Sequence, residues 1–383
     1  MEDVIVVGGG VIGLSIAVEL SGQGVAVAVI EQGDFGREAS WAGAGILPPG
    51  NRQAARTPEA QLRSLSHFLW PDWAESLEAE SGIDPGYCRC GGLELRLGSN
   101  QAELLDEIRN WKSEDARIDE LSPDEATHLE PQLSPRISAV YRLPELSQVR
   151  NPRLLKALVA ACGERGVRLV PGTPVIGFDE REGRITGLRT PTDMFHAGRY
   201  CVAGGAWSRT ILASLGVQIA VEPVRGQIVL LSHIPRLFSN VLQLGPRYAV
   251  PRSDGKILLG ATEERVGFLK RNTASAVSDL IAFGTSLVPA LADARFERAW
   301  SGLRPGSADG LPYLGQVGGH DNLFIAAGHF RSGLQMSPGT ARLLRQSLLE
   351  QETEFPLEPF SCHRNLGTAA LVSEGEAHNS NGS

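Results

Sequence analysis

Two short apolar runs near the start of the chain flank a stretch in which apolar residues recur at helical spacing. The first run, residues 4–7, is rich in β-branched side chains, which is typical of a buried parallel strand. Residues 11–20 carry the helical pattern, Gly22 and Gly24 end it, and residues 25–30 form the second apolar run. The pattern therefore predicts a strand–helix–strand unit.

Three glycines lie between the first strand and the helix with the spacing GxGxxG: Gly8, Gly10 and Gly13. Gly8 permits a tight turn, Gly10 lets the backbone approach a pyrophosphate, and Gly13 lets the helix pack near the sheet. The unpaired N–H groups at the start of the helix favour phosphate. Glu31 closes the second strand, where a carboxylate accepts hydrogen bonds from a ribose and disfavours a 2′-phosphate. These features predict a site for NAD or FAD rather than NADP.

The next segment, residues 33–50, reads GDFGREASWAGAGILPPG and is rich in small residues. It is too irregular for a long helix, and small side chains let a backbone lie flat against a planar ligand. A nicotinamide-dependent dehydrogenase would continue into further helix–strand units. Here the chain enters a different, mostly helical region instead, which favours FAD over NAD.

The rest of the chain alternates between helical and strand patterns. Helical spacing of apolar residues predicts helices at residues 61–80, 101–112, 151–165, 273–287 and from Gly339 onward. Short apolar or alternating runs predict strands at residues 91–98, 167–170, 173–178, 185–189, 200–202 and 324–328. The pattern of an antiparallel sheet occurs at residues 224–231, 248–251 and 256–261.

Together these elements predict an α/β protein in which a Rossmann-like FAD-binding domain is interleaved with an α+β substrate domain built on an antiparallel sheet. The FAD domain would collect residues 1–50, 148–217 and 301–350. The substrate domain would collect residues 51–147 and 218–300. Residues 366–383 are small, polar and acidic, so we expect a disordered tail.

Composition narrows the classes of partner. The chain of 383 residues has a net charge of −8, which argues against nucleic acid because phosphate binding needs a basic face. The sequence has no run of about 20 apolar residues, so we expect no membrane association. Its five cysteines are scattered and lack the paired spacing of a zinc site. We therefore expect free thiols, no metal site and a cytoplasmic protein.

One arginine raises the question of a missing anion. Arg304 lies in WSGLRPGSADGLPYLG, a stretch otherwise made of apolar, small and turn-forming residues. A guanidinium is costly to bury unless an anion meets it, and that anion could be a structural carboxylate, a cofactor phosphate or a substrate. Because the first helix already provides a phosphate site, we favour the carboxylate of a substrate.

Several segments occur in order along nearly the whole chain: VVGGGVIGLSIAVEL, VIEQG, EASWAGAGIL, QVRNPRLLKAL, CVAGGAWS, RYAVPRSDGKILLGATEERVGF, WSGLRPGSADGLPYLG and AAGHFRSGLQMSPGTARLL. Together they resemble the FAD-dependent oxidases of the D-amino-acid oxidase family. The resemblance is greater to the glycine oxidases of thiamine biosynthesis than to the sarcosine oxidases. It implies a D-amino-acid oxidase-like fold, bound FAD and, because relatives are often tetramers, a homo-oligomer. Sarcosine oxidases link the flavin to a cysteine, and residues 302–313 contain none, so the FAD should be non-covalent.

The glycine motif and the resemblance together indicate the FAD-binding residues. By resemblance, the start of the first helix meets the pyrophosphate, and the turn after residues 324–328 meets the pyrimidine edge of the flavin. Main-chain N–H groups of that turn, with Arg331, would stabilise the negative charge of the reduced flavin. We assign His329 to cofactor contact rather than to catalysis as a base. The predicted set is Gly8, Gly10, Val11, Ile12, Gly13, Glu31, Ala39, Ser40, Ala44, Gly45, Ile46, Val175, Gly328, His329, Phe330, Arg331, Ser332, Gly333, Leu334 and Gln335.

The resemblance also implies how a small amino-acid substrate binds. Arg304 would hold its carboxylate through a bidentate fork, and Tyr248 would donate a further hydrogen bond. We place Arg331 beside this pair, while Glu263 or Glu264 would approach the amine. We predict no catalytic acid or base, because hydride transfer from the α-carbon to flavin N5 needs mainly orientation and a neutral amine. The expected products are a 2-oxo acid, ammonia and, with dioxygen as electron acceptor, hydrogen peroxide.

Other interpretations stay open at this level. A D-amino-acid dehydrogenase would pass electrons to quinone, and a sarcosine oxidase-like enzyme would remove an N-methyl group. A flavoprotein with an idle pocket would serve as a binding partner. The sequence does not rank glycine, sarcosine and D-amino acids, because the size of the pocket depends on how residues 51–147 fold.

Overall fold

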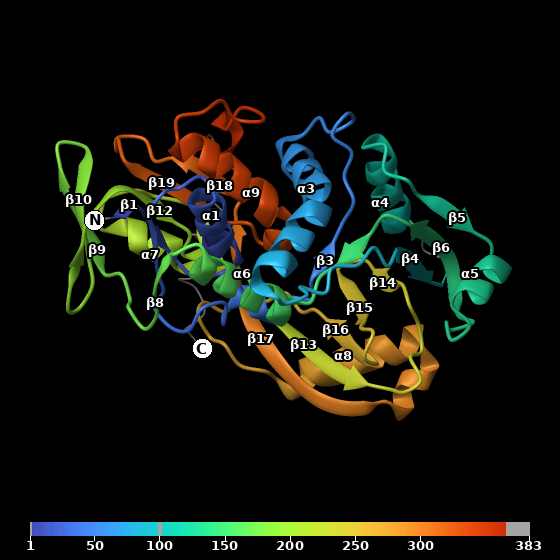
Figure 1. Cartoon of the computed structure of the whole chain (residues 1–383). Helices are drawn as coiled ribbons and strands as arrows, with labels where there is room; N and C mark the ends of the chain where they lie inside the picture. Colours follow the sequence, from blue (N-terminus) through green and yellow to red (C-terminus); the bar gives the residue numbers. More distant parts are fainter. Residues whose placement is uncertain (1, 99–101, 365–383) are drawn as a thin grey trace, which may run out of the picture.

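A six-stranded sheet with the order β18–β19–β12–β1–β2–β8 forms the centre of the computed structural model, which describes residues 2–98 and 102–364 (Figure 1). Its strands are β1 (Glu2–Val7), β2 (Val27–Ile30), β8 (Arg168–Val170), β12 (Ala197–Val202), β19 (Leu323–Ala327) and the antiparallel edge strand β18 (Tyr313–Gln316). Helix α1 (Val11–Ser21) connects β1 to β2, which confirms the predicted α/β class and the first strand–helix–strand unit. The predicted disordered tail lies outside the described residues.

Both faces of this sheet are buried, as a parallel sheet requires. Val4 and Val6 belong to a core shared with α1, α3 (Pro58–Ser81), α6 (Asn151–Glu164) and α9 (Gly333–Leu348). Ile5 and Val7 belong to a core on the other face, shared with α7 (Ser208–Ala213) and a small antiparallel sheet. That small sheet consists of β9 (Gly177–Arg181), β10 (Arg184–Arg189) and β11 (Met194–Phe195).

A second sheet has eight strands in the order β17–β13–β16–β15–β14–β4–β6–β5, and α8 (Ala274–Leu287) packs against it. The strands are β4 (Gly92–Leu97), β5 (Asp119–Leu121), β6 (Ile137–Leu143), β13 (Val221–Ser232), β14 (Val241–Leu244), β15 (Arg247–Pro251), β16 (Lys256–Gly260) and β17 (Arg295–Ser307). The antiparallel pattern predicted at residues 224–231, 248–251 and 256–261 is confirmed, because β16 pairs antiparallel with both β13 and β15. Elsewhere in the sheet, β4 and β14 run parallel. These two strands are joined by a long crossover rather than a hairpin, which permits the parallel direction.

Short elements complete the described chain. They are α2 (Ala39–Ala42), β3 (Ile46–Leu47), α4 (Ala102–Ser113), α5 (Pro123–Leu129), β7 (Ser147–Gln148), η1 (Gly205–Trp207), η2 (Pro289–Asp293) and η3 (Glu358–Phe360). Strand β17 runs without a break across residues 300 and 301, where the predicted domain boundary lies. The domain limits stay a prediction.

The strand predicted at residues 173–178 begins later in the structure, because β9 starts only at Gly177. The N–H groups of Gly172 and Thr173 bond to the carbonyls of Gly33 and Glu31, at 3.0 and 2.8 Å, rather than to a neighbouring strand, and Pro174 has no N–H to donate. The first part of the segment therefore follows the loop after β2. The chain joins the small sheet only from Ile176, whose N–H bonds to the carbonyl of Arg189 at 2.9 Å.

Helix α9 begins at Gly333, six residues before the predicted start at Gly339. Pro338 lies inside the helix, where its missing N–H would leave the carbonyl of Leu334 without its helical partner. The hydroxyl of Ser337 donates to that carbonyl at 2.9 Å. A local side-chain hydrogen bond thus lets the helix include a proline that the sequence pattern treats as a stop.

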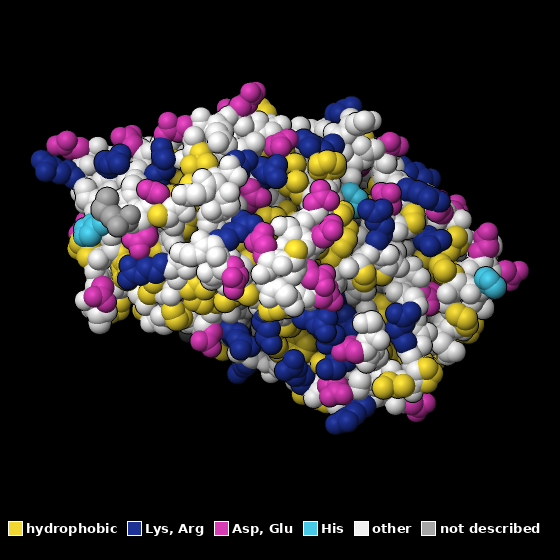
Figure 2. Space-filling model, viewed as in Figure 1, with side chains coloured by type: hydrophobic (Ala, Val, Ile, Leu, Met, Phe, Trp, Pro, Cys, Tyr) yellow, Lys and Arg dark blue, Asp and Glu magenta, His cyan; other side chains and the backbone are white. Residues whose placement is uncertain are grey.

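Surface and side-chain chemistry add three observations. Acidic and basic side chains are interspersed over the face shown in Figure 2, so acids interrupt the basic residues there. All five cysteines are free. Within residues 2–98 and 102–364, no helix is long and apolar enough to cross a membrane, and no group of three or more His, Cys, Asp and Glu side chains is placed to hold a metal.

The buried carboxyl of Glu94 generates a test of pH-dependent stability. Glu94 accepts a hydrogen bond from Gln243 Nε2 at 2.5 Å, and burial together with the nearby charge of Glu107 raises its pKa to about 8. A folded-state pKa above the unfolded value means that stability is full at low pH and is lost as the pH rises toward 8. We expect Glu94→Gln to remove this loss. The free energy of unfolding of the variant, relative to that of the wild type, should therefore rise by at least about 1 kcal/mol between pH 5 and pH 8. Urea unfolding at both pH values measures the difference, and equal pH dependence of the two proteins would contradict the assignment.

Candidate active site

A cavity of about 430 Å³ lies at the carboxyl ends of the central strands. Val7, Ile30 and Ala327, the last residues of β1, β2 and β19, line it, together with the first residues of α1. The carboxyl edge of an open α/β sheet is where ligands bind in such folds, because the loops there diverge and helix N-termini point inward. The fold therefore places a large ligand site where the glycine motif predicts one.

The glycine motif is closely packed at the turn from β1 into α1. Gly8 has φ of +112°, and a Cβ at this position would lie 2.4 Å from the carbonyl oxygen of Ala203. A Cβ at Gly13 would lie 1.9 Å from the carbonyl oxygen of Gly8. A side chain at Gly8 would clash with the turn after β12, and one at Gly13 would force the start of α1 away from β1. The hydroxyl of Ser40 accepts a hydrogen bond from Val11 N–H at 2.9 Å, so this N–H already has a partner, and the hydroxyl hydrogen is left to donate to a phosphate oxygen.

Glu31 lines the same cavity and is held from both sides. Its Oε2 accepts a hydrogen bond from Gly9 N–H at 2.7 Å, and its Oε1 accepts one from Gly33 N–H at 2.9 Å. Each carboxylate oxygen can accept a further hydrogen bond, so Glu31 can bind a ribose hydroxyl while it keeps its backbone partners. The N–H groups of Gly9 and Gly33, in two different loops, thus position Glu31, the predicted partner of the ribose.

A smaller cavity of about 120 Å³ adjoins the large one, and both are lined by Ala39, Gly43, Arg304, Arg331 and Leu334. Tyr248 and the predicted flavin neighbours Ala44, Gly45 and Ile46 line the small cavity. The predicted substrate residues Arg304, Tyr248 and Arg331 are therefore together on its wall. They come from β17, β15 and the turn before α9, which lie far apart in the sequence.

Arg304 extends across the backbone of the neighbouring strand β13. A Cβ at Gly226 would lie 2.4–2.5 Å from the guanidinium atoms, so only glycine leaves room for it. Its Nη1 donates to the carbonyl oxygen of Thr262 at 3.0 Å. Among the described carboxylates none forms an ion pair with Arg304. The guanidinium therefore has further N–H groups that can donate to an anion.

Tyr248 lies next to this guanidinium on the wall of the small cavity. A Cβ at Gly260, opposite Tyr248 on β16, would lie 2.5 Å from the tyrosine ring, so a second strand glycine makes room for a second side chain. Burial raises the pKa of the Tyr248 phenol, although the charge of Arg304 opposes the shift. The phenol consequently stays protonated at neutral pH and can donate to a carboxylate.

Other predicted residues have partners within the protein. Arg331 forms an ion pair with Glu263, and its side chain is 51% exposed. His329 is buried with Nε2 at 3.0 Å from the hydroxyl of Thr340, and burial lowers its pKa to about 3. Its imidazole is neutral and bound to α9, which suits a cofactor wall better than a base that must reach a substrate proton.

Some predicted cofactor residues line neither cavity. Gln335 is buried, and its amide donates to the carbonyls of Pro48 and Arg63 at 2.9 and 3.2 Å, so it fastens α9 to the segment before α3. Gly13, Gly328 and Ser332 lie just behind the wall, whereas the remaining members of the predicted set line one cavity or the other.

Sequence reasoning missed several wall residues. Trp207, Thr210, Glu38 and Gln32 line the large cavity, and Thr262 lines the small one. Gly226 had a readable signal, because a glycine inside a strand pattern often marks the close approach of another group. The others have ordinary sequence surroundings, and only the fold brings them to the site.

The fold and the cavity define a dinucleotide-dependent oxidoreductase. The chain matches the family model described as FAD dependent oxidoreductase over residues 3–347, and it belongs to this family. It is 36% identical to a glycine oxidase of Pseudomonas putida over 96% of this chain and 100% of that protein. A crystal structure of glycine oxidase from Geobacillus kaustophilus has a TM-score of 0.90 and 34% identity, with 96% of this chain and 99% of that chain covered. A bifunctional protein ThiO/ThiG of Synechocystis is 34% identical over 96% of this chain, which spans 54% of that protein.

The cofactor of the family is FAD, and the described residues fit it. Glu31 offers acceptors for a ribose, and the hydroxyl of Ser40, which accepts from Val11 N–H, has its own hydrogen to donate to a pyrophosphate beside the N-terminus of α1. The closely packed glycines leave the backbone bare where a phosphate approaches. The walls of both cavities are otherwise formed largely by apolar and small residues, as a planar ring system requires.

Replacing Glu31 tests its assignment to the cofactor. In Glu31→Gln one of the two backbone N–H groups would face an amide N–H instead of an acceptor. Hydrogen bonds to a charged group contribute about 1.5–3 kcal/mol, so we expect the Kd for FAD to rise about tenfold or more. Titration of FAD into the apoprotein, followed by flavin fluorescence, measures it. The matched control is Asp34→Asn, a nearby exposed acid that should leave the Kd unchanged, and an unchanged Kd in Glu31→Gln would contradict the assignment.

Proposed function

We propose that the protein is an oxidase that deaminates glycine and other small amines or D-amino acids. The observation that carries this proposal is the guanidinium of Arg304, which has no carboxylate partner among the described residues. It faces a small cavity that opens onto the FAD cavity. The similarity to glycine oxidases of two organisms supports the same substrate class.

The substrate would be oriented by its carboxylate. Arg304 donates from a planar fork that matches a carboxylate, and the protonated Tyr248 adds a donor on the same side. The contact of Arg304 with Thr262 and the glycine beneath it restrict the positions that the fork can take. The α-carbon of a bound amino acid would then face the part of the wall formed by Ala44, Gly45 and Ile46. Restricting the geometry in this way is a large source of rate enhancement.

FAD, when bound, supplies the acceptor for the α-hydrogen as hydride. The protein then needs to hold the carboxylate, keep the reacting carbon near the cofactor and leave the amine neutral. The neutral, buried imidazole of His329 suits a place in the cavity wall and not the role of a proton acceptor in catalysis. The imine product hydrolyses to a 2-oxo acid and ammonia, and we propose dioxygen as the final electron acceptor, with hydrogen peroxide as product.

The small volume next to Arg304 supports a substrate with a small side chain. Peroxide formation from glycine under air tests the oxidase assignment against a dehydrogenase that passes electrons to quinone, and a panel with sarcosine and D-alanine ranks the substrates. We also propose a place in thiamine biosynthesis, which the similarity to a bifunctional protein ThiO/ThiG supports. A homotetramer and a cytoplasmic location stay predictions.

Arg304→Ala tests the carboxylate site. Truncating one partner of a buried charge pair costs about 2–5 kcal/mol, so we expect kcat/KM for glycine to fall on the order of 100- to 1,000-fold while FAD stays bound. A peroxide-coupled assay and the flavin absorbance of the purified protein measure the two quantities. Arg295→Ala, an exposed arginine on the same strand, is the matched control. Unchanged turnover in Arg304→Ala would show that the carboxylate lies elsewhere.

Gly226→Ala tests the same site without removing a charge. The added Cβ would lie within about 2.5 Å of the guanidinium, which must move because the strand backbone cannot. We expect KM for glycine to rise about tenfold with FAD content unchanged, which corresponds to about 1.4 kcal/mol. Gly163→Ala, on α6 with no atom within 4 Å of the added Cβ, provides a steady-state kinetic control. Wild-type kinetics in Gly226→Ala would mean that the position of Arg304 does not limit binding.

A further inference from the structure

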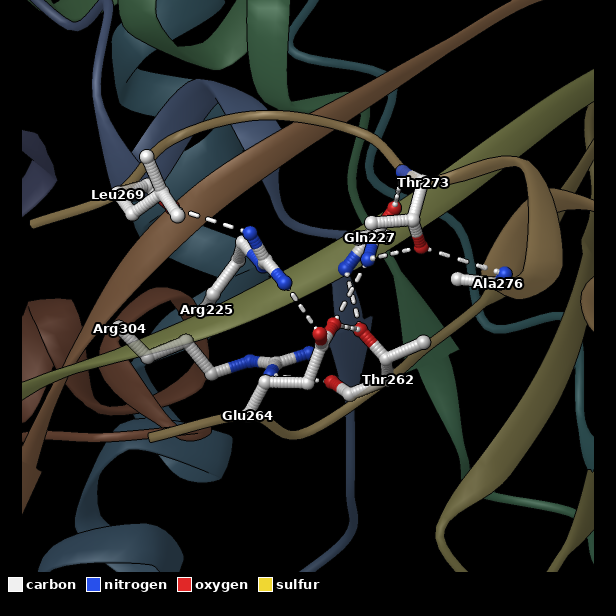
Figure 3. A network of polar contacts seen from close by, with 8 residues as sticks. All are labelled: Arg225, Gln227, Thr262, Glu264, Leu269, Thr273, Ala276 and Arg304. Atoms are coloured by element: carbon white, nitrogen blue, oxygen red, sulfur yellow. Dashed lines mark hydrogen bonds and ion pairs between the residues drawn. The ribbon is translucent and has the colours of Figure 1, made fainter. Parts of the chain in front are cut away.

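A network of polar contacts reaches Arg304 through Thr262 (Figure 3). At its centre is the carboxylate of Glu264, which accepts hydrogen bonds from Thr262 Oγ1 and Gln227 Nε2, both at 2.7 Å, and forms an ion pair with Arg225. The Arg225 side chain is 4% exposed, whereas that of Glu264 is 29% exposed. The network therefore places a full negative charge next to the predicted substrate site.

Thr262 connects this carboxylate to Arg304. Its hydroxyl donates to Glu264 and accepts from Gln227 N–H at 3.0 Å, while its carbonyl accepts from Arg304 Nη1 at 3.0 Å. Figure 3 shows the Glu264 carboxylate and the Arg304 guanidinium both reaching this one residue. The two opposite charges thus both contact Thr262, yet they form no ion pair with each other.

Arg225 accounts for this separation. Besides the ion pair, the main chains of Arg225 and Glu264 bond to each other in both directions, at 2.9 and 3.0 Å. The other guanidinium nitrogen of Arg225 donates to the carbonyl of Leu269 at 3.3 Å, which limits its movement. Burial by itself would raise the pKa of Glu264, but hydrogen bonds from Arg225, Thr262 and Gln227 lower it to about 2. The carboxylate is therefore charged at neutral pH and needs a cation.

Gln227 fixes the far side of the network. It is fully buried, its Oε1 accepts from Thr273 N–H at 2.8 Å, and its Nε2 also contacts the Thr273 hydroxyl at 3.3 Å. Thr273 in turn caps the start of α8 by accepting a hydrogen bond from Ala276 N–H. The carboxylate of Glu264 is consequently tied to two elements of the sheet domain, and its position is set before any ligand binds.

We propose that Arg225 is a positioning residue that holds the Glu264 carboxylate away from Arg304 and so keeps the Arg304 fork open for the carboxylate of the substrate. The inference rests on the proposed function, because it assumes that Arg304 binds that carboxylate. Without Arg225, Glu264 would need another cation, and Arg304 contacts the same residue, Thr262, that donates to the Glu264 carboxylate. The internal carboxylate would then compete with the substrate carboxylate for the same guanidinium.

The test compares Arg225→Met, Glu264→Gln and the double variant as FAD-loaded proteins. Titration calorimetry measures the Kd for acetate, a carboxylate that the enzyme cannot deaminate, and steady-state kinetics separates KM from kcat for glycine. We expect Arg225→Met to raise the acetate Kd and the glycine KM about tenfold or more, with kcat at saturation within about twofold of the wild type. The double variant should return both constants to within about threefold of the wild type, because no competing carboxylate remains.

Two further variants test the same proposal if Arg225→Met folds poorly. Arg225→Lys keeps the cation and should bind acetate nearly as the wild type does, and Glu264→Gln alone should bind it at least as tightly. Arg265→Met removes an exposed arginine of the same segment, which pairs with Glu222, and serves as the matched control. The proposal is overturned if Arg225→Met binds acetate as the wild type does, if the double variant is no better than Arg225→Met, or if Glu264→Gln weakens binding. A wild-type protein that neither binds acetate nor oxidises glycine would instead overturn the proposed function, and the inference with it.

Discussion

The antiparallel pairing of β13 with β17 is the interaction on which both parts of the molecule depend. It extends from Val221 opposite Ser307 to Ser232 opposite Arg295, and the two strands curve side by side along the lower edge of the molecule in Figure 1. One end of the pair carries Arg304 into the wall of the FAD cavity. The other end packs Val229 into the core beneath α8. A single ladder therefore connects Arg304, at the wall of the large cavity, with the core of the eight-stranded sheet.

Glycines in this ladder let other parts of the molecule approach it. Gly226 and Gly302 face each other in the register of β13 and β17. The guanidinium of Arg304 lies against Gly226, and a Cβ at Gly302 would lie 2.5 Å from the Cβ of Ala42 on α2. Glycine inside a strand weakens the strand itself, because glycine loses more backbone entropy on folding than other residues and has no side chain to pack. Here that loss allows α2 and the guanidinium of Arg304 to pack against the same strand pair.

The parts that the sequence predicted well depend on neighbours along the chain. The strand–glycine–helix–strand unit was predictable because its hydrophobic pattern, its turn and its closing acid all fall within about thirty residues of one another. The helix predicted at residues 273–287 follows from local apolar spacing in the same way, and the structure has α8 at Ala274–Leu287. The errors came where a distant or unusual partner overrides the local pattern. The N–H of Thr173 bonds to the loop after β2 instead of to a strand, so β9 begins later than predicted, and Ser337 supplies the hydrogen bond that lets α9 contain a proline.

The sequence by itself determined the fold class, the cofactor family and the set of charged residues near the site, because motifs and patterns report on local geometry and on the types of side chain available. Only the tertiary structure decided which of those charges has a partner. Arg331 pairs with Glu263, 68 residues away, and Arg225 pairs with Glu264, 39 residues away, whereas Arg304 pairs with no described carboxylate. Whether a charge is neutralised depends on distances of a few ångströms between side chains from different strands. Strand register and the packing of the two sheets set those distances, and the spacing of residues along the chain does not contain them.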